Sequence, residues 1–305
     1  MLILGAGASI PFGFPTGREL KEEIVRLKND YQPFIQHLIS AGFNREDIYS
    51  FSDTLKSSLA PSVDRFLEFS VNFQPEYRRL GCAAIAANLL IRSQSLGRNG
   101  DHDWLELLFS ALHPQFDEGL DEDKLTVVTF NYDCSFEYYL YNGLLNTIGP
   151  KRTENTLAKI KIIYLHGRLN PSVEAWRAVP ISKEAIEDSI NPEKGIKIIH
   201  EQNPHMPAFS DARVAIQNAQ RICFLGFGYD ETNLSRLLQG QNSDVMRRKT
   251  IFGSAFGRTN MENVNVNSTI FMDMCRFGQN HWKISEFLRE SGIFSQMCHL
   301  PELRM

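Results

Sequence analysis

Six short apolar segments divide the chain, and their spacing constrains its fold more than any other feature. Each is a continuous apolar run rather than an alternation of apolar and polar residues, which is typical of parallel strands covered on both faces. Helical periodicity fills the stretches between them. The sequence therefore predicts an α/β fold in which a mostly parallel sheet carries helices on both faces. The expected strands are Leu2–Leu4, Leu125–Phe130, Ile160–Leu165, Ile222–Phe227, Thr250–Ser254 and Thr269–Met272.

One interval between these strands is much longer than the others. From about Tyr31 to Lys124 several segments have helical periodicity, and no convincing strand interrupts them. We therefore predict a core formed by residues 1–30 and 125–305, with a helical insertion over residues 31–124. At 305 residues the chain is long enough for one large domain of this kind.

Composition excludes several classes of function. A net charge of −4 argues against a general polyanion binder, so we expect no direct binding of nucleic acid. No apolar run approaches the length of about 18 residues that a membrane helix needs. The first residues lack a basic region and a cleavage site, so we expect a cytoplasmic protein without a membrane anchor.

The cysteines do not form a metal-binding pattern. No C-x-x-C occurs among them, so a zinc module has no support and we expect no metal. Reduced thiols in the core or at the surface explain them better than a disulfide framework. The five cysteines are Cys82, Cys134, Cys223, Cys275 and Cys298.

The first strand runs into "GAGAS", Gly5 to Ser9. Glycines at such a point let the backbone turn sharply and approach a pyrophosphate, although a purely structural turn explains two glycines equally well. The usual dinucleotide fingerprint requires a third glycine where this chain has Ile10, followed by Pro11. Thr16 and Glu19 form a capping box. The segment after Ser9 is therefore predicted to be a loop that folds over a ligand and ends at the first helix.

Polar residues follow the second strand in "TFNYD", Thr129 to Asp133. In parallel sheets the carboxyl ends of the strands carry the ligand contacts. Asn131 offers a donor and an acceptor, and Asp133 offers a carboxylate. Taken alone, Asp133 is equally explained as the N-cap of the helix that follows.

Two further strands end in residues of the same kind. The third ends in "LHG", where His166 can act as a general base near neutral pH or can be purely structural. The adjacent Gly167 leaves room for a ligand. The fourth ends in "GFGYD", where Gly226 and Gly228 suit a ribose or phosphate and Asp230 is a ligand residue or an N-cap. Because parallel strands share one carboxyl edge, we expect all four motifs to converge there.

As an ordered set, these motifs resemble those of the sirtuin-like NAD-consuming family. "GAGAS" is similar to the family's G-A-G-x-S turn, "TFNYD" to its T-x-N-x-D motif and "LHG" to its catalytic His-Gly. "FGFPTGR" resembles the G-I-P-D-F-R loop and retains Gly13, Pro15 and Arg18. "LGFGYD" falls where the family contacts the adenosine ribose. The matching motifs extend from residue 4 to about residue 233.

Two departures narrow the resemblance. The four-cysteine zinc module of sirtuin deacylases is absent, and Thr16 and Gly17 stand where the family's loop has Asp and Phe. The pattern is more similar to a zinc-free prokaryotic branch with a helical insertion, whose members hydrolyse NAD during antiviral defence. "PSVDRFLE" (Pro61–Glu68) and "TIFGSAFG" (Thr250–Gly257) resemble stretches of that branch more loosely.

The resemblance implies a Rossmann-like NAD-binding core and a role for each motif residue. His166 would be the base that acts through a ribose hydroxyl, Asn131 would orient ribose or water, and Asp133 would hold the nicotinamide end. Arg18 would pair with a phosphate or stay on the loop. The residues implied to border NAD are Gly5, Ala6, Gly7, Ser9, Phe12, Pro15, Arg18, Thr129, Gly167, Gly226, Gly228 and Asp230.

The function implied is an NAD⁺ glycohydrolase, with NAD as substrate and without a metal, that depletes NAD in antiviral defence. There are two alternatives. One is a zinc-free deacylase or ADP-ribosyltransferase, and the other is a sensor that binds NAD or ADP-ribose without hydrolysis. An unregulated enzyme of this kind would kill its own cell. We therefore expect control by homo-oligomerisation or by a separate regulatory protein subunit of the same defence system.

Overall fold

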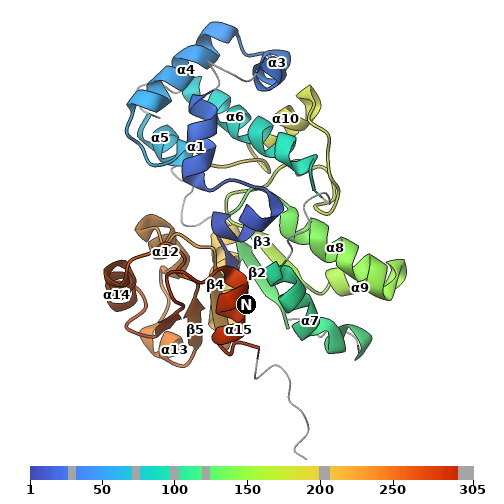
Figure 1. The fold of residues 1–305 in the computed structure, drawn as a ribbon, viewed down its shortest axis with the longest axis vertical. Helices are drawn as coiled ribbons and strands as arrows, with labels where there is room; N and C mark the ends of the chain where they lie inside the picture. The colour runs from blue at the N-terminus through green and yellow to red at the C-terminus, as the bar shows by residue number, and fades with distance from the viewer. Residues whose placement is uncertain (27–31, 71–75, 97–102, 119–123, 199–206, 295–305) are drawn as a thin grey trace, which may run out of the picture.

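A computed structural model of the chain describes residues 1–26, 32–70, 76–96, 103–118, 124–198 and 207–294. Figure 1 shows two parts, one built around a sheet and the other entirely helical. None of the described helices is long and apolar enough to cross a membrane. Of the five cysteines, Cys298 lies outside the described residues; the other four are free thiols, three of them buried.

The sheet contains six parallel strands in the order β3-β2-β1-β4-β5-β6. This is the strand order of a dinucleotide-binding Rossmann fold, and it confirms the predicted α/β class. Leu4 pairs with both Thr129 and Leu225, so the first, second and fourth strands end at the same level. The strands are β1 Leu2–Leu4, β2 Thr126–Thr129, β3 Lys161–Tyr164, β4 Arg221–Leu225, β5 Thr250–Gly253 and β6 Cys275–Phe277.

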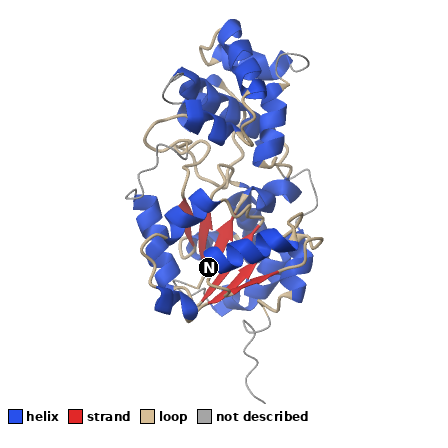
Figure 2. Ribbon diagram, turned by 90° about the vertical axis from the view of Figure 1, so that its left-hand side faces the viewer, coloured by secondary structure: helices blue, strands red, loops and turns tan. Residues whose placement is uncertain are grey.

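Helices cover both faces of this sheet (Figure 2). Alternate strand residues enter opposite clusters of apolar side chains: Leu4 packs on one face, and Ile3 and Val128 pack on the other. Burial on both faces explains why the strands are continuous apolar runs. The helices of this part are α7 Asp103–Glu118, α8 Ser135–Ile148, α9 Pro150–Leu157, α11 Pro207–Asn218, α12 Glu231–Leu238, α13 Ser243–Arg247, α14 Asn260–Thr269 and α15 Ile284–Glu290.

The second part, called here the helical module, lies beyond the carboxyl ends of the strands (Figure 1). Its apolar core is continuous with the cluster on one face of the sheet, so the two parts do not have separate interiors. The helical module consists of α1 Gly17–Val25, α3 Gln32–Ser40, α4 Arg45–Ser57, α5 Val63–Ser70, α6 Glu76–Ser93 and α10 Lys183–Ser189.

The helical module does not coincide with the predicted insertion over residues 31–124. Helix α1, expected in the core with residues 1–30, packs against α4, α5 and α6. Helix α7, expected in the insertion, packs against α8 and α15 beside the sheet. Helix α10, from residues 125–305, packs against α6 and α3. The two parts therefore exchange helices along the chain.

Two local predictions were wrong. Thr269–Met272 is not a strand, because a capping box at Thr259 and Glu262 starts α14 and the helix continues to Thr269. The sixth strand is β6, and Phe271 is buried from a turn before it. The segment after Ser9 is not simply a loop: residues Ala6–Phe12 form a 3₁₀ helix, η1, which ends at Gly13 in a left-handed conformation. The capping box of Thr16 and Glu19 that begins α1 is confirmed.

Candidate functional site

The turns after β1 and β4 lie against each other at the centre of the sheet. Gly5 N–H donates to the Leu225 carbonyl at 3.0 Å, and Gly7 N–H donates to the Gly226 carbonyl at 2.9 Å. Gly226 has a φ of +57°, and a Cβ there would lie 2.1 Å from the Ala8 nitrogen. Glycine is thus required for two backbones to meet where the strand order reverses, which is the place where such sheets bind nucleotides.

A buried chain of hydrogen bonds joins "GAGAS" to "TFNYD". The Asn131 Nδ2 donates to the Gly5 carbonyl at 2.9 Å and to the Ser9 Oγ at 3.0 Å. The Ser9 hydroxyl in turn donates to the Asp133 Oδ1 at 3.1 Å. Within the described residues no hydrogen bond reaches the Asn131 Oδ1, so that acceptor remains for a ligand. Four of the predicted site residues, Gly5, Ser9, Asn131 and Asp133, therefore form one unit. Thr129 supports it, because its hydroxyl accepts the Asn131 backbone N–H at 3.0 Å.

The Asp133 carboxyl is the buried end of this unit. Its Oδ1 also accepts the backbone N–H of Ser135 at 3.1 Å and the Ser135 hydroxyl. Burial raises the pKa of Asp133, and these hydrogen bonds oppose the rise. Cys134 occupies the N-cap position of α8 and does not cap with its side chain. Asp133 therefore supports the start of α8 from one residue earlier while it holds Ser9.

His166 lies in an aromatic environment at the end of β3. Its ring is 5.3 Å from that of Phe130, 6.2 Å from that of Tyr132 and 6.4 Å from that of Phe209, measured between centroids. His166 is buried, and its carbonyl accepts the Lys197 N–H at 2.9 Å. Phe130 and Tyr132 flank Asn131 in sequence, so "LHG" and "TFNYD" meet, as predicted from their positions at strand ends.

The space beside Gly167 is filled in this structure. With a φ of +71°, a Cβ at Gly167 would lie 1.9 Å from the Gly195 carbonyl oxygen. This glycine therefore admits the returning segment that follows α10. Gly228 differs, because it is exposed and no heavy atom lies within 4 Å of the place where its Cβ would be. Of these two glycines predicted to border NAD, Gly228 is the one that has open space beside it.

Asp230 is both an N-cap and a contact to the helical module. Its Oδ1 accepts the Asn233 N–H at 3.0 Å, which starts α12. Its Oδ2 lies 3.5 Å from a guanidinium nitrogen of Arg65 on α5. The pair is partly exposed, so it contributes little to stability on its own. It does place α5 over the end of β4.

The segment between Ser9 and α1 is packed rather than open. Phe12 is fully buried with its ring 4.7 Å from that of Tyr139, and the Trp104 Nε1–H donates to the Ala8 carbonyl at 3.0 Å. Pro15 is buried as well, whereas Arg18 is exposed on α1. Arg92 of α6 donates to the Gly13 carbonyl at 2.6 Å. Both parts of the molecule thus hold this segment in place.

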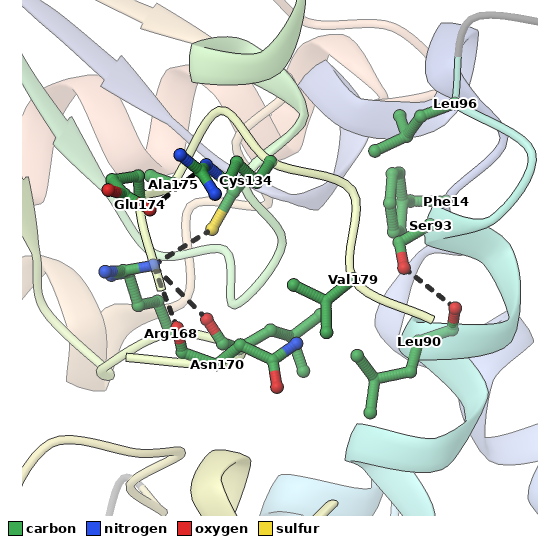
Figure 3. A pocket seen from close by; sticks show the side chains of 12 residues that line it. Phe14, Leu90, Ser93, Leu96, Cys134, Arg168, Asn170, Glu174, Ala175 and Val179 are labelled. Carbon is green, nitrogen blue, oxygen red and sulfur yellow. Dashed lines mark hydrogen bonds and ion pairs between the residues drawn. The ribbon is translucent and has the colours of Figure 1, made fainter. Parts of the chain in front are cut away.

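A small pocket opens beside Cys134, between the sheet part and the end of α6. Figure 3 shows Arg168 and Cys134 on one side of it, with Phe14 and Leu90 on the other. Arg168 donates to the carbonyls of Leu169, Asn170, Pro171 and Val173, so its guanidinium organises the loop after "LHG". That arginine is therefore a structural residue of the pocket wall.

A second cavity lies behind Asn131 and Asp133, and Glu137 of α8 lines it. Tyr164, the last residue of β3, donates a hydrogen bond to the Glu137 carboxylate. Burial raises the pKa of Glu137 to about 7. A carboxyl that titrates near neutrality therefore lies close to the proposed ligand-binding residues.

Several residues of this region were missed by the sequence interpretation. Asp64 and Trp104 contact "TFNYD" and "GAGAS" from helices distant in sequence. Glu137 bonds to Tyr164 just before "LHG", and Arg168 lies beside Cys134 just after "TFNYD". Arg168 follows "LHG" directly, and Asp64 lies in the "PSVDRFLE" stretch; both positions were signals that could have singled them out. Glu137 and Trp104 had none, because each lies in an ordinary amphipathic helix.

No group of three or more His, Cys, Asp or Glu residues that could hold a metal ion occurs in the part of the chain that the structure describes. In comparisons with known proteins, no protein-family model matches the chain, and no curated protein is significantly similar to it.

Proposed function

We propose that this chain is an NAD⁺ glycohydrolase that releases nicotinamide and ADP-ribose. The observation that carries the proposal is the Asn131 amide, which two hydrogen bonds fix in place while its Oδ1 stays available. It lies at the centre of a sheet with the strand order β3-β2-β1-β4-β5-β6, beside a glycine turn, where dinucleotides bind in such folds. The resemblance of the four motifs to sirtuin-like enzymes supports the same reaction.

The chemistry places definite demands on these residues. Cleavage of the C–N glycosidic bond leaves its electron pair on the nicotinamide nitrogen and builds oxocarbenium-like charge on the ribose, as in glycoside hydrolysis. A water oxygen then bonds to the anomeric carbon and loses a proton. Asn131 would orient the ribose or the water, and His166 would take up the proton through a ribose hydroxyl. Asp133 would hold the nicotinamide end, either directly or through Ser9.

The proposal extends to the biological role. A chain that hydrolyses NAD would act as a regulated NAD-depleting effector in prokaryotic antiviral defence, in the cytoplasm where NAD is found. Its control would come from homo-oligomerisation or from a separate regulatory subunit. Size-exclusion chromatography of the chain alone, and after co-expression with its genomic neighbours, tests this part.

Product analysis tests the proposed reaction directly. Purified protein is incubated with NAD⁺, and nicotinamide and ADP-ribose are quantified by chromatography. Asn131→Ala and His166→Ala are expected to lower turnover at least about 100-fold, since positioned polar groups and bases contribute factors of this order. Asn146→Ala and His281→Ala are the matched controls, because both wild-type residues are exposed.

Each alternative predicts a different result. A zinc-free deacylase or ADP-ribosyltransferase would consume NAD⁺ only when an acylated or acceptor protein is added. A sensor would bind NAD or ADP-ribose in calorimetry without forming product. Folded Asn131→Ala and His166→Ala proteins with full turnover would exclude the assigned site, even if the chain hydrolyses NAD⁺.

A further inference from the structure

Helix α5 of the helical module reaches the ends of two strands with adjacent side chains. The Tyr132 hydroxyl donates to the Asp64 Oδ1 at 2.5 Å. The next residue, Arg65, lies 3.5 Å from Asp230 at the start of α12. A helix that contacts both "TFNYD" and "GFGYD" covers the edge where the predicted ligand residues converge.

Asp64 is half-buried on α5, with its carboxyl against the Tyr132 hydroxyl. Burial raises its pKa, and the hydrogen bond from Tyr132 opposes the rise. No cation within the described residues lies at ion-pair distance from it; Arg65 instead contacts Glu68 at 2.5 Å and Asp230. Placing a carboxyl there without a cationic partner is unfavourable for stability, which suggests a role other than stabilising the fold.

Tyr132 connects this carboxyl to the predicted site. It stands between Asn131 and Asp133 in the chain, and its carbonyl accepts the Leu169 N–H at 2.9 Å. Its ring is buried 6.2 Å from the ring of His166. A shift of this tyrosine would therefore displace both the His166 ring and the backbone that carries Asn131.

We propose that Asp64 is a positioning residue of this site, which acts by holding the Tyr132 hydroxyl so that the Tyr132 ring fixes His166. The inference rests on the proposed function, and it means that the helical module completes a site otherwise built at the strand ends. Asp64 itself contacts no reacting atom; its effect passes through Tyr132.

Kinetics of three variants test the proposal. The Tyr132 hydroxyl has two acceptors, the Asp64 Oδ1 and, farther away at 3.3 Å, the Lys197 carbonyl. Asp64→Ala removes the nearer one, and we expect kcat to fall at least tenfold while KM changes less than threefold. Asp64→Asn keeps an acceptor oxygen, so its kcat is expected to stay close to that of wild type and well above that of Asp64→Ala. Tyr132→Phe removes the donor and should reproduce the loss of Asp64→Ala. In the double variant Asp64→Ala/Tyr132→Phe the losses should not add fully, because both substitutions break the contact between Tyr132 and Asp64.

Two controls separate positioning from general damage. Asp211→Ala removes an exposed aspartate from α11 and is expected to keep the wild-type kcat. Thermal unfolding of every variant shows whether it is folded. Wild-type kcat in folded Asp64→Ala, a loss in Asp64→Asn as large as in Asp64→Ala, or losses that add fully in the double variant would overturn the proposal.

A spectroscopic measurement keeps the inference separate from the proposed reaction. The imidazole signals of His166, assigned with His166→Gln, are expected to shift in Asp64→Ala and in Tyr132→Phe but not in Asp211→Ala. If wild-type protein hydrolyses no NAD⁺, the proposed function fails, and this shift alone decides the role of Asp64. Unchanged His166 signals in both variants would reject it whatever the activity.

Discussion

At the scale of single residues, the glycines of the strand ends have a role that does not depend on a ligand. Gly5 and Gly226 allow two backbones to meet: a Cβ at Gly5 would lie 2.7 Å from the Gly226 carbonyl oxygen. This close approach places "GAGAS" directly beside "GFGYD" at the centre of the sheet. The contact of the two turns at the topological switch point thus requires these glycines whether or not a ligand binds there.

Gly226→Ala is therefore expected to destabilise the fold strongly. The new methyl group would meet the Ala8 nitrogen in a left-handed backbone conformation, and we expect a loss of at least about 3 kcal/mol in the free energy of unfolding. Gly240→Ala is the matched control: its φ is +74°, but nothing lies within 4 Å, so only about 1 kcal/mol should be lost. Equal losses in urea denaturation would contradict the close approach.

Glu137 makes stability depend on pH near neutrality. Its pKa rises from 4.5 in the unfolded chain to about 7 in the fold. Between these values the native state binds more protons than the unfolded state, so the free energy of unfolding falls as the pH rises. In Glu137→Gln the side chain at this position no longer titrates. Its stability relative to wild type should therefore increase by about 3 kcal/mol between pH 4.5 and pH 8.

Urea denaturation across this pH range measures the difference between Glu137→Gln and wild type. Glu106→Gln, an exposed position on α7, is the control, and its stability should run parallel to that of wild type. A difference for Glu137→Gln that stays constant with pH would show that Glu137 titrates alike in the folded and unfolded states.

The sequence predicted part of this residue-scale arrangement. Ser9, Asn131 and Asp133 meet as expected, because parallel strands deliver their last residues to one edge. Asp64 and Glu137 could not be found in the same way. Their importance comes from Tyr132 and Tyr164, which reach them across the fold, and no spacing along one chain encodes such contacts.

At the scale of elements, five of the six strands were predicted and one was not. The five are buried runs between helices, so composition alone identifies them. The "TIFM" run has the same composition, but a capping box ten residues earlier commits it to the end of α14. Segment η1 was missed for a related reason: Pro11 suggested a loop, yet burial of Phe12 and the bond from Trp104 stabilise a 3₁₀ helix.

The hydrogen bond from Trp104 leads to a prediction for η1. Trp104→Phe keeps an aromatic ring but leaves the buried Ala8 carbonyl without this donor, at a cost of about 1–3 kcal/mol. We expect hydrogen exchange at the amides of Gly7 to Ile10 to become faster in this variant. Trp282→Phe, on a partly buried residue near α15, should leave these amides unchanged. Unaltered exchange in Trp104→Phe would mean that α7 does not anchor η1.

At the scale of the whole molecule, the division into two parts could not be predicted from contiguous segments. The expected insertion over residues 31–124 contains most of the helical module, but α1 and α10 join it from outside and α7 leaves it for the sheet. The apolar pattern of an amphipathic helix shows which of its faces is buried, but it does not show which other element covers that face. The chain crosses between the parts near the proposed site, and Arg92 links α6 to Gly13 and to Glu23 of α1.

Native-state hydrogen exchange with increasing urea tests this division, because helices that open together belong to one cooperative unit. We expect α1 to open with α4, α5 and α6, and α7 to open with α8 and the strands. Leu80→Ala, in the buried face of α6, should lower the opening free energy of the helical module by about 2–5 kcal/mol and affect α7 much less. If α7 instead followed α6 while α1 followed the sheet, the contiguous division would be correct. Under either division Asp64 lies across the boundary from Tyr132, so its hold on Tyr132 should weaken each time the helical module opens.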